Sequence, residues 1–98
     1  MSEIQQISEY EFRKYRVSLC GPLGALIIEE REWYVGSPPE TLGVVILDRI
    51  DNDWGFVVLS PDEHGDFRAV DTGSSFQDID SARDALRIAM ISQGPSRK

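Results

Sequence analysis

Residues 42–60 read LGVVILDRIDNDWGFVVLS, two apolar runs separated by the polar sequence Asp51-Asn52-Asp53. Short apolar runs bounded by turn-forming residues are typical of β-strands joined in a hairpin. A third run, residues 66–72, follows the turn-forming stretch PDEHG at 61–65. The sequence therefore predicts a three-stranded antiparallel meander over residues 42–72, with strands at 42–50, 53–60 and 66–72.

The middle run of this meander carries apolar side chains at both parities. Successive side chains of a strand point to opposite faces of its sheet. One set is Trp54, Phe56 and Val58, and the other is Gly55, Val57 and Leu59. We therefore expect the middle strand to be covered on both faces.

Residues 76–93 have the pattern of an amphipathic helix. Apolar residues recur at steps of three and four, namely Ile79, Ala82, Leu86, Ala89 and Met90. Asp78 is the predicted N-cap, because a short acceptor side chain there satisfies free amides of the first turn. Gly94-Pro95 should end the helix and leave residues 94–98 as a flexible basic tail.

The N-terminal part predicts a second helix. Ser8 and Glu11 have the spacing of a capping box ahead of apolar residues at steps of three and four, which favours a helix over residues 9–19. Residues 23–35 favour a turn or short helix followed by a strand at 31–35. The predicted fold is α+β: a three- to four-stranded, mostly antiparallel sheet with an N-terminal and a C-terminal helix packed on it, in one domain spanning residues 1–93.

Composition places the chain among ordinary soluble globular proteins, with 41% hydrophobic and 28% charged residues. The longest apolar run, VVIL at 44–47, is much too short to cross a bilayer, and the N-terminus lacks the features of a signal peptide. We expect a cytoplasmic protein that does not bind membranes. The single Cys20 fits a reducing compartment and is expected to be a small buried group.

The charges are unevenly distributed along the chain. The net charge is −7, but residues 21–80 hold thirteen acids and three arginines, whereas residues 81–98 hold one acid and four bases. An acidic surface repels phosphate backbones, so nucleic-acid binding is disfavoured. Its only evident route, kept as the alternative function, is the basic C-terminal helix and tail, with Arg83, Arg87, Arg97 and Lys98.

No complete catalytic or metal motif is present. Asp51, Asp53 and Gly55 are out of register with an EF-hand loop, which needs its glycine at the sixth position. A cation held by Asp48, Asp51 and Asp53 is therefore the weaker interpretation, and turn formation the stronger. His64 is the only histidine, which disfavours zinc. We expect no cofactor, no metal and no catalytic residue, and an enzyme using His64 or the aspartates is the least favoured hypothesis. No small-molecule ligand is indicated.

The favoured function is that of a small acidic protein-interaction or regulatory module. Two acidic hairpin tips are expected at opposite ends of the middle strand, and a sheet edge would offer unpaired backbone groups. Self-association is expected through an edge strand or the Trp33-Tyr34 region. The predicted partner-binding residues are Trp33, Tyr34, Asp48, Asp51, Asp53, Trp54, Asp62, Glu63 and Asp66.

Overall fold

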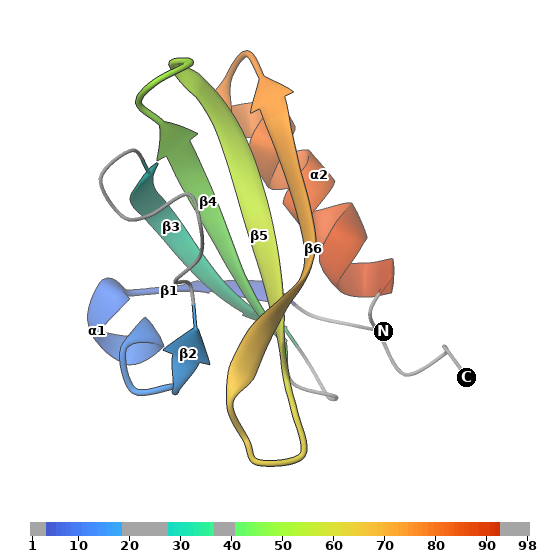
Figure 1. The fold of residues 1–98 in the computed structure, drawn as a ribbon. Helices are drawn as coiled ribbons and strands as arrows, with labels where there is room; N and C mark the ends of the chain where they lie inside the picture. Colours follow the sequence, from blue (N-terminus) through green and yellow to red (C-terminus); the bar gives the residue numbers. More distant parts are fainter. Residues whose placement is uncertain (1–3, 19–27, 37–40, 93–98) are drawn as a thin grey trace.

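A twisted antiparallel sheet carries a helix on each face (Figure 1). The computed structural model describes residues 4–18, 28–36 and 41–92. The elements in chain order are β1 (Ile4–Ile7), α1 (Glu9–Phe12), β2 (Val17–Ser18), β3 (Ile28–Gly36), β4 (Leu42–Asp48), β5 (Asp53–Pro61), β6 (Phe67–Phe76) and α2 (Ile79–Ser92). The α+β class expected from the sequence is confirmed.

The sheet order is β1-β3-β4-β5-β6-β2. Strands β3 to β6 form a continuous meander, β1 adds antiparallel to β3, and the two-residue β2 adds parallel to β6. The predicted three-stranded meander is present, but the sheet has more strands than the three or four expected. Strand β1 was missed because Ile4 and Ile7 are three residues apart and show no alternation of period two.

Each face of the sheet has its own core. On the α2 face, Phe56 and Val58 of β5 pack with Val45 and with the helix residues Ala82, Leu86, Ala89 and Met90. On the α1 face, Leu59 packs with four other buried residues, Phe12, Leu42, Val44 and Phe67. The middle strand is therefore covered on both faces, as its pattern predicted.

Helix α2 lies close against β4 at Gly43. A β-carbon at this position would lie 2.7 Å from Met90 Sδ and 2.8 Å from Leu86 Cδ1, so the helix approaches over bare backbone. The Asp78 carboxylate accepts a hydrogen bond of 2.8 Å from the Ser81 amide, which confirms the predicted N-cap. Because this cap lies just ahead of Ile79, the helix begins at 79 and not at 76.

The predicted N-terminal helix over residues 9–19 is wrong in its length. Ser8 does cap it, accepting a hydrogen bond of 3.1 Å from the Glu11 amide, but α1 ends at Phe12. A turn follows α1, and Val17 of β2 then pairs with Phe67 of β6. The spacing of Phe12 and Tyr15 suited a helix, yet this turn places both side chains in the core on the α1 face.

Strands β3 and β6 are longer than predicted. Ile28 to Glu30, assigned to a turn or helix, belong to β3, and β6 continues beyond residue 72 to Phe76. Two register shifts in the pairing of β5 with β6 accommodate the extra residues of β6. The predicted segments around Cys20 and 23–27, at 37–40 and at 94–98 lie outside the described residues.

Candidate functional site

The turn between β4 and β5 is built around Asp48. Its carboxylate accepts hydrogen bonds from the amides of Ile50 (2.9 Å) and Asp51 (3.3 Å), and its carbonyl accepts one of 2.7 Å from the Asn52 amide. Asn52 has a φ of 58°, a left-handed conformation that asparagine tolerates well. Asp48 is therefore a turn-forming residue, and its backbone bonds hold the tip in one conformation.

The outward side chains of this turn are differently placed. Ile50 is 68% exposed. Among the described residues, Asp51 and Asp53 form no ion pair, whereas Arg49 is paired with Glu29 of β3. The tip thus presents an exposed apolar side chain beside two carboxylates that form no ion pair with any described residue.

The start of α2 lies at the same end of the sheet. Trp54 at the start of β5 pairs with Phe76 at the end of β6, so the connection into α2 lies beside the β4–β5 turn (Figure 1). It adds Asp78 and Asp80 to this end. We call the set of Asp48, Ile50, Asp51, Asp53, Asp78 and Asp80 the acidic end. Sequence inspection missed that Asp78 and Asp80 join it, since 25 residues separate Asp53 from Asp78.

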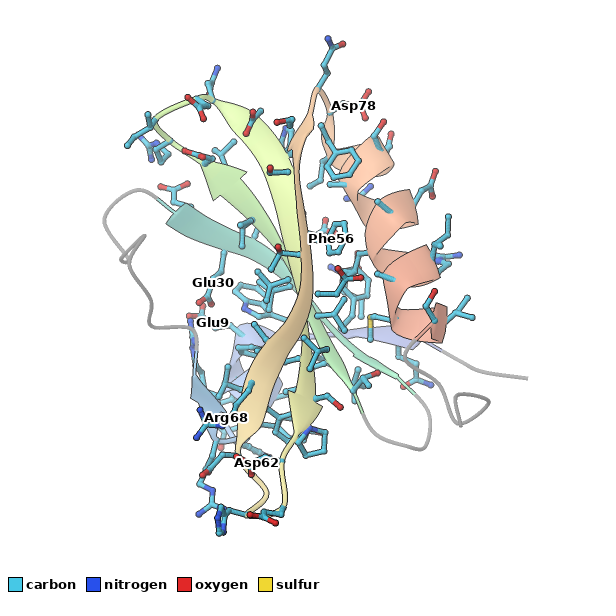
Figure 2. The ribbon with its side chains drawn as sticks, turned by 45° about the vertical axis from the view of Figure 1, so that its right-hand side comes forward. Glu9, Glu30, Phe56, Asp62, Arg68 and Asp78 are labelled. Atoms are coloured by element: carbon cyan, nitrogen blue, oxygen red, sulfur yellow. The ribbon has the colours of Figure 1, made fainter. Side chains whose placement is uncertain are left out.

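The second acidic tip, at residues 62–66, lies at the opposite end of β5, as expected. Figure 2 shows Asp62 and Arg68 at this end and Asp78 at the other. Arg68 Nε donates to Asp62 at 2.8 Å, and this bond, with backbone bonds from Asp66 and His64, lowers the pKa of Asp62. Arg16 Nε lies 2.9 Å from Asp66 Oδ1.

Two arginines therefore offset two of the three acids at this tip, and only Glu63 faces no arginine among the described residues. The contact of Arg16 was not predictable from the sequence, because Arg16 is 50 residues from Asp66 and is brought to this tip by the pairing of β2 with β6. The two tips were predicted as separate acidic surfaces at opposite ends of the middle strand, and the structure adds that their charges are compensated to different degrees.

His64 lies on the exposed turn of the second tip. Its side chain is 72% exposed, and Nε2 is 3.7 Å from Glu63 Oε2. Within residues 4–18, 28–36 and 41–92, no group of three or more histidine, cysteine or carboxylate side chains could hold a metal ion. Glu63 is 87% exposed, so His64 and this carboxylate lie together on the surface of the turn.

The three aromatic residues predicted to bind a partner belong to the cores. Trp33 and Tyr34 are neighbours on β3 and point to opposite faces: Trp33 packs with Phe12 on the α1 face, and Tyr34 lies against α2. The Trp33 indole donates to Glu30 at 3.0 Å. Trp54 also packs against the α2 core. All three are half-buried, so they do not form one exposed patch.

A polar network ties α2 to β3. Arg83 donates to both oxygens of Glu32, at 2.8 and 2.5 Å, and the Tyr34 hydroxyl donates to Glu32 at 2.6 Å. The bonds from Arg83 lower the pKa of Glu32. Burial, reinforced by the bond to Glu32, raises the pKa of Tyr34 to about 12. Glu32 and Arg83 are 51 residues apart, and nothing in the sequence pairs them.

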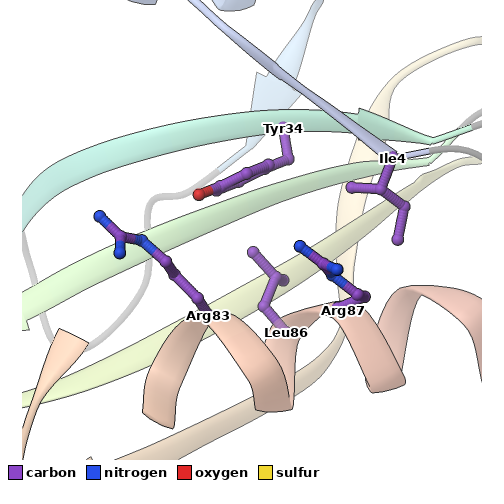
Figure 3. Close-up of a pocket in the computed structure, with 5 residues that line it drawn as sticks. All are labelled: Ile4, Tyr34, Arg83, Leu86 and Arg87. Atoms are coloured by element: carbon purple, nitrogen blue, oxygen red, sulfur yellow. The ribbon is translucent and has the colours of Figure 1, made fainter. Parts of the chain in front are cut away.

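A shallow hollow adjoins this network, lined by Ile4, Tyr34, Arg83, Leu86 and Arg87 (Figure 3). Its volume of about 10 Å³ is at the lower limit for a single water molecule, so it does not hold an organic ligand.

The residues predicted to bind nucleic acid differ in their contacts. Arg83 is held by Glu32 and by Asp80, at 2.7 Å. Arg87 is exposed and forms no ion pair with any described residue. Asp84 lies on the same helix, one turn before Ile88. Arg97 and Lys98 lie outside the described residues.

The outer edge of β6 is irregular. Strand β2 pairs only with Phe67 and Arg68, so the rest of β6 has no outer neighbour among the described strands. Register shifts occur on either side of the central part of β6, and Ser75 has a φ of 71°. Bulges of this kind are a common protection against pairing with another strand. The sheet edge named as a partner surface is therefore poorly shaped for adding a strand here.

Comparison with protein-family models, with curated proteins and with solved structures finds no match to the chain. No helix in the described part of the chain is long and apolar enough to cross a membrane.

Proposed function

We propose that this protein is a non-catalytic interaction module whose acidic end binds a positively charged surface of another protein. The observation that carries the proposal is the exposed Ile50, which directly precedes Asp51 and lies three residues before Asp53 on a turn that Asp48 holds in one conformation. A small apolar contact surrounded by charge is the usual anatomy of a recognition surface.

Each part of the acidic end has a separate role in this proposal. The unpaired carboxylates attract a basic partner over distances up to about 8 Å at physiological salt and orient its approach. Ile50 then enters an apolar pocket of the partner and slows dissociation. The turn is already ordered by its bonds to Asp48, so binding does not have to fix its backbone.

The carboxylates whose pKa values are shifted favour a non-enzymatic role. Glu32, Asp62 and Asp78 each have a lowered pKa because arginine or backbone donors bind them, so their ionised forms serve the fold. A catalytic acid or base more often has its pKa moved toward neutrality.

The test is affinity capture of partners from the native host with the tagged full chain. Ile50→Ser and the double variant Asp51→Asn/Asp53→Asn should each reduce the retained partner about tenfold or more, because each removes one component of the contact. Retention by the wild type should also fall as salt is raised.

The matched controls are Tyr10→Ser, which removes another exposed apolar side chain, and Glu63→Gln, which removes an acid from the opposite tip. Both should retain the partner like the wild type. Recovery of nucleic acid in place of protein, or equal retention by the acidic-end variants, would refute the proposal.

A further inference from the structure

Residues 4–18 reach from one edge of the described sheet to the other. Strand β1 pairs with β3 at the first edge, and β2 pairs with β6 at the second. Helix α1 lies between these two strands in the chain and packs Phe12 into the core on the α1 face (Figure 1). We call residues 4–18 the strap, because they tie the two edges together.

The strap buries few side chains. Among residues 4–17, Phe12 is fully buried and every other residue is half-buried or exposed. The central strands β4 and β5 bury far more, namely Leu42, Val44, Val45, Phe56, Val58 and Leu59. A segment with little buried apolar surface opens at a lower free energy than the core of the same protein. The strap therefore has less to lose on opening than the centre of the sheet.

The polar links of the strap lie at the surface. Arg13 is 2.6 Å from Glu30 of β3, but the Arg13 side chain is 49% exposed. Arg16 is 2.9 Å from Asp66, and its side chain is 69% exposed. Ion pairs between exposed side chains stabilise a fold only slightly. The backbone adds the two paired residues of β2 and a hydrogen bond of 2.7 Å from the Phe67 amide to the Arg16 carbonyl.

The two cores depend on the strap to different degrees. The core on the α2 face receives from it only the half-buried Ile4. The core on the α1 face receives Phe12 and three half-buried side chains, Ile7, Tyr15 and Val17. These pack on side chains that are at most 5% exposed, namely Leu42, Val44, Leu59 and Phe67. Opening of the strap thus uncovers one face of the sheet and leaves α2 packed on the other.

We infer that the strap opens as a unit while β3 to β6 and α2 stay folded, and that it controls the exposure of the apolar surface formed by Leu42, Val44, Leu59 and Phe67. The closed state hides this surface, and the open state presents it. The opening uses neither Ile50 nor the carboxylates of the acidic end, so it does not depend on the proposed function.

Native-state hydrogen exchange of the full chain in increasing urea tests the opening. The reporters are the amides of Phe12 and Arg13, which are bonded around α1, and the amide of Phe67, which is bonded to the Arg16 carbonyl. Protection of all three should be about tenfold or more below that of the central amides of β4 and β5. Their exchange should also depend on urea more weakly than global unfolding does, because the opening exposes less surface. Equal protection of the reporters and the central amides would overturn the inference.

A double variant tests whether the strap moves as one unit. Glu30→Gln/Asp66→Asn removes both ion pairs that join the strap to the sheet and should lower the protection of the three reporters together, about threefold or more. The central amides of β4 and β5 should keep their protection. Arg49→Met is the matched control, since it removes an exposed ion pair outside the strap, and it should leave the reporters unchanged.

Phe12→Ala tests the apolar surface under the strap. This variant should bind a fluorescent dye specific for exposed apolar surface about threefold or more above the wild type, while the amides of α2 stay protected. Dye binding equal to that of the wild type would overturn the inference. So would a loss of protection in β5 and α2 together with the reporters, in either variant, because the strap would then belong to the cooperative core.

Discussion

Glu32 is only 13% exposed and is bound by side chains from two elements. Arg83 of α2 and Tyr34 of β3 both donate to its carboxylate. A mostly buried carboxylate loses much of its hydration and depends on these donors to stay ionised. The ionisation of Glu32 on β3 therefore depends on the position of α2, which supplies Arg83.

Removing the cation from this network should cost more than removing both charges. Arg83→Met leaves Glu32 without its cation and should lower the free energy of unfolding, by less than for a fully buried pair because Arg83 is partly exposed. Glu32→Gln/Arg83→Met should cost less than Arg83→Met alone. Urea unfolding measures both. Arg87→Met, one turn further along α2, is the control and should change stability by no more than about 0.5 kcal/mol.

Tyr34 should make stability fall at alkaline pH. Its folded pKa of about 12 is above the ordinary tyrosine value of about 10. The contribution is complete below about pH 10 and is lost as pH rises toward 12, because the unfolded chain ionises first. Tyr34→Phe should make the urea midpoint less dependent on pH in this range and remove a step near pH 12 from the tyrosinate absorbance titration. Tyr10→Phe, at an exposed position, should show the same alkaline fall in urea midpoint as the wild type. An unchanged alkaline slope in Tyr34→Phe would contradict the assignment.

At the scale of elements, the parts that were predictable are those with local causes. The N-caps Ser8 and Asp78 and the two hairpin turns depend on a few consecutive residues, and the structure has them where the sequence indicated. The end of α1 was not predictable in this way. Residues 13–18 leave the helix because Tyr15 packs edge-on against Phe67, 5.3 Å between ring centres, and Val17 pairs with the same strand. A tertiary contact with β6 thus overrides the local helical spacing.

Strand β6 was also mispredicted because of a tertiary contact, which here makes the element longer than the sequence predicts. Gly73, Ser74 and Ser75 have the composition of a loop, and nothing local predicts that they extend a strand. In the structure the ring of Phe56 covers Gly73, where a β-carbon would collide with it. The extension therefore depends on a residue of β5.

The cap of α2 can be tested against a matched acid on the same helix. Asp78→Ala should lower the free energy of unfolding at neutral pH, because it leaves the Ser81 amide without its acceptor. Asp84→Ala removes an exposed acid that accepts no hydrogen bond from a described residue and should have a smaller effect. Hydrogen bonding from Ser81 lowers the pKa of Asp78, so the difference between the variants should shrink as pH falls through that pKa. A difference that persists in acid would contradict a role for the ionised carboxylate.

For the whole molecule, the acidic composition was plain from the sequence, but its distribution in space was not. Composition and order along the chain indicated two acidic tips at opposite ends of β5, and the strand directions place them there. Arg16 and Arg68 then offset one tip, whereas Asp78 and the Arg83-paired Asp80 join Asp51 and Asp53 at the other. Such differences arise from residues that only the folded sheet brings together.

Acidification tests whether direct contacts or overall repulsion dominate the stability of this chain. Lowering pH relieves the repulsion of a net charge of −7, which favours folding, but it also protonates the bound carboxylates Glu32, Asp62 and Asp78. Their lowered pKa values mean that the unfolded state takes up protons first, so their contribution is present above the ordinary carboxylate pKa of about 4 and is lost as pH falls through the folded values.

At about 0.15 M salt, repulsion beyond about 8 Å is screened and the direct contacts persist, so the urea midpoint should fall from pH 5 toward about pH 3. Asp62→Asn should reduce this slope, because Asp62 accepts from Arg68 and from two backbone amides. Asp51→Asn, which removes a carboxylate without an ion pair among the described residues, should leave the slope as in the wild type. A midpoint that rises in acid would mean that repulsion outweighs these contacts even in screened solution.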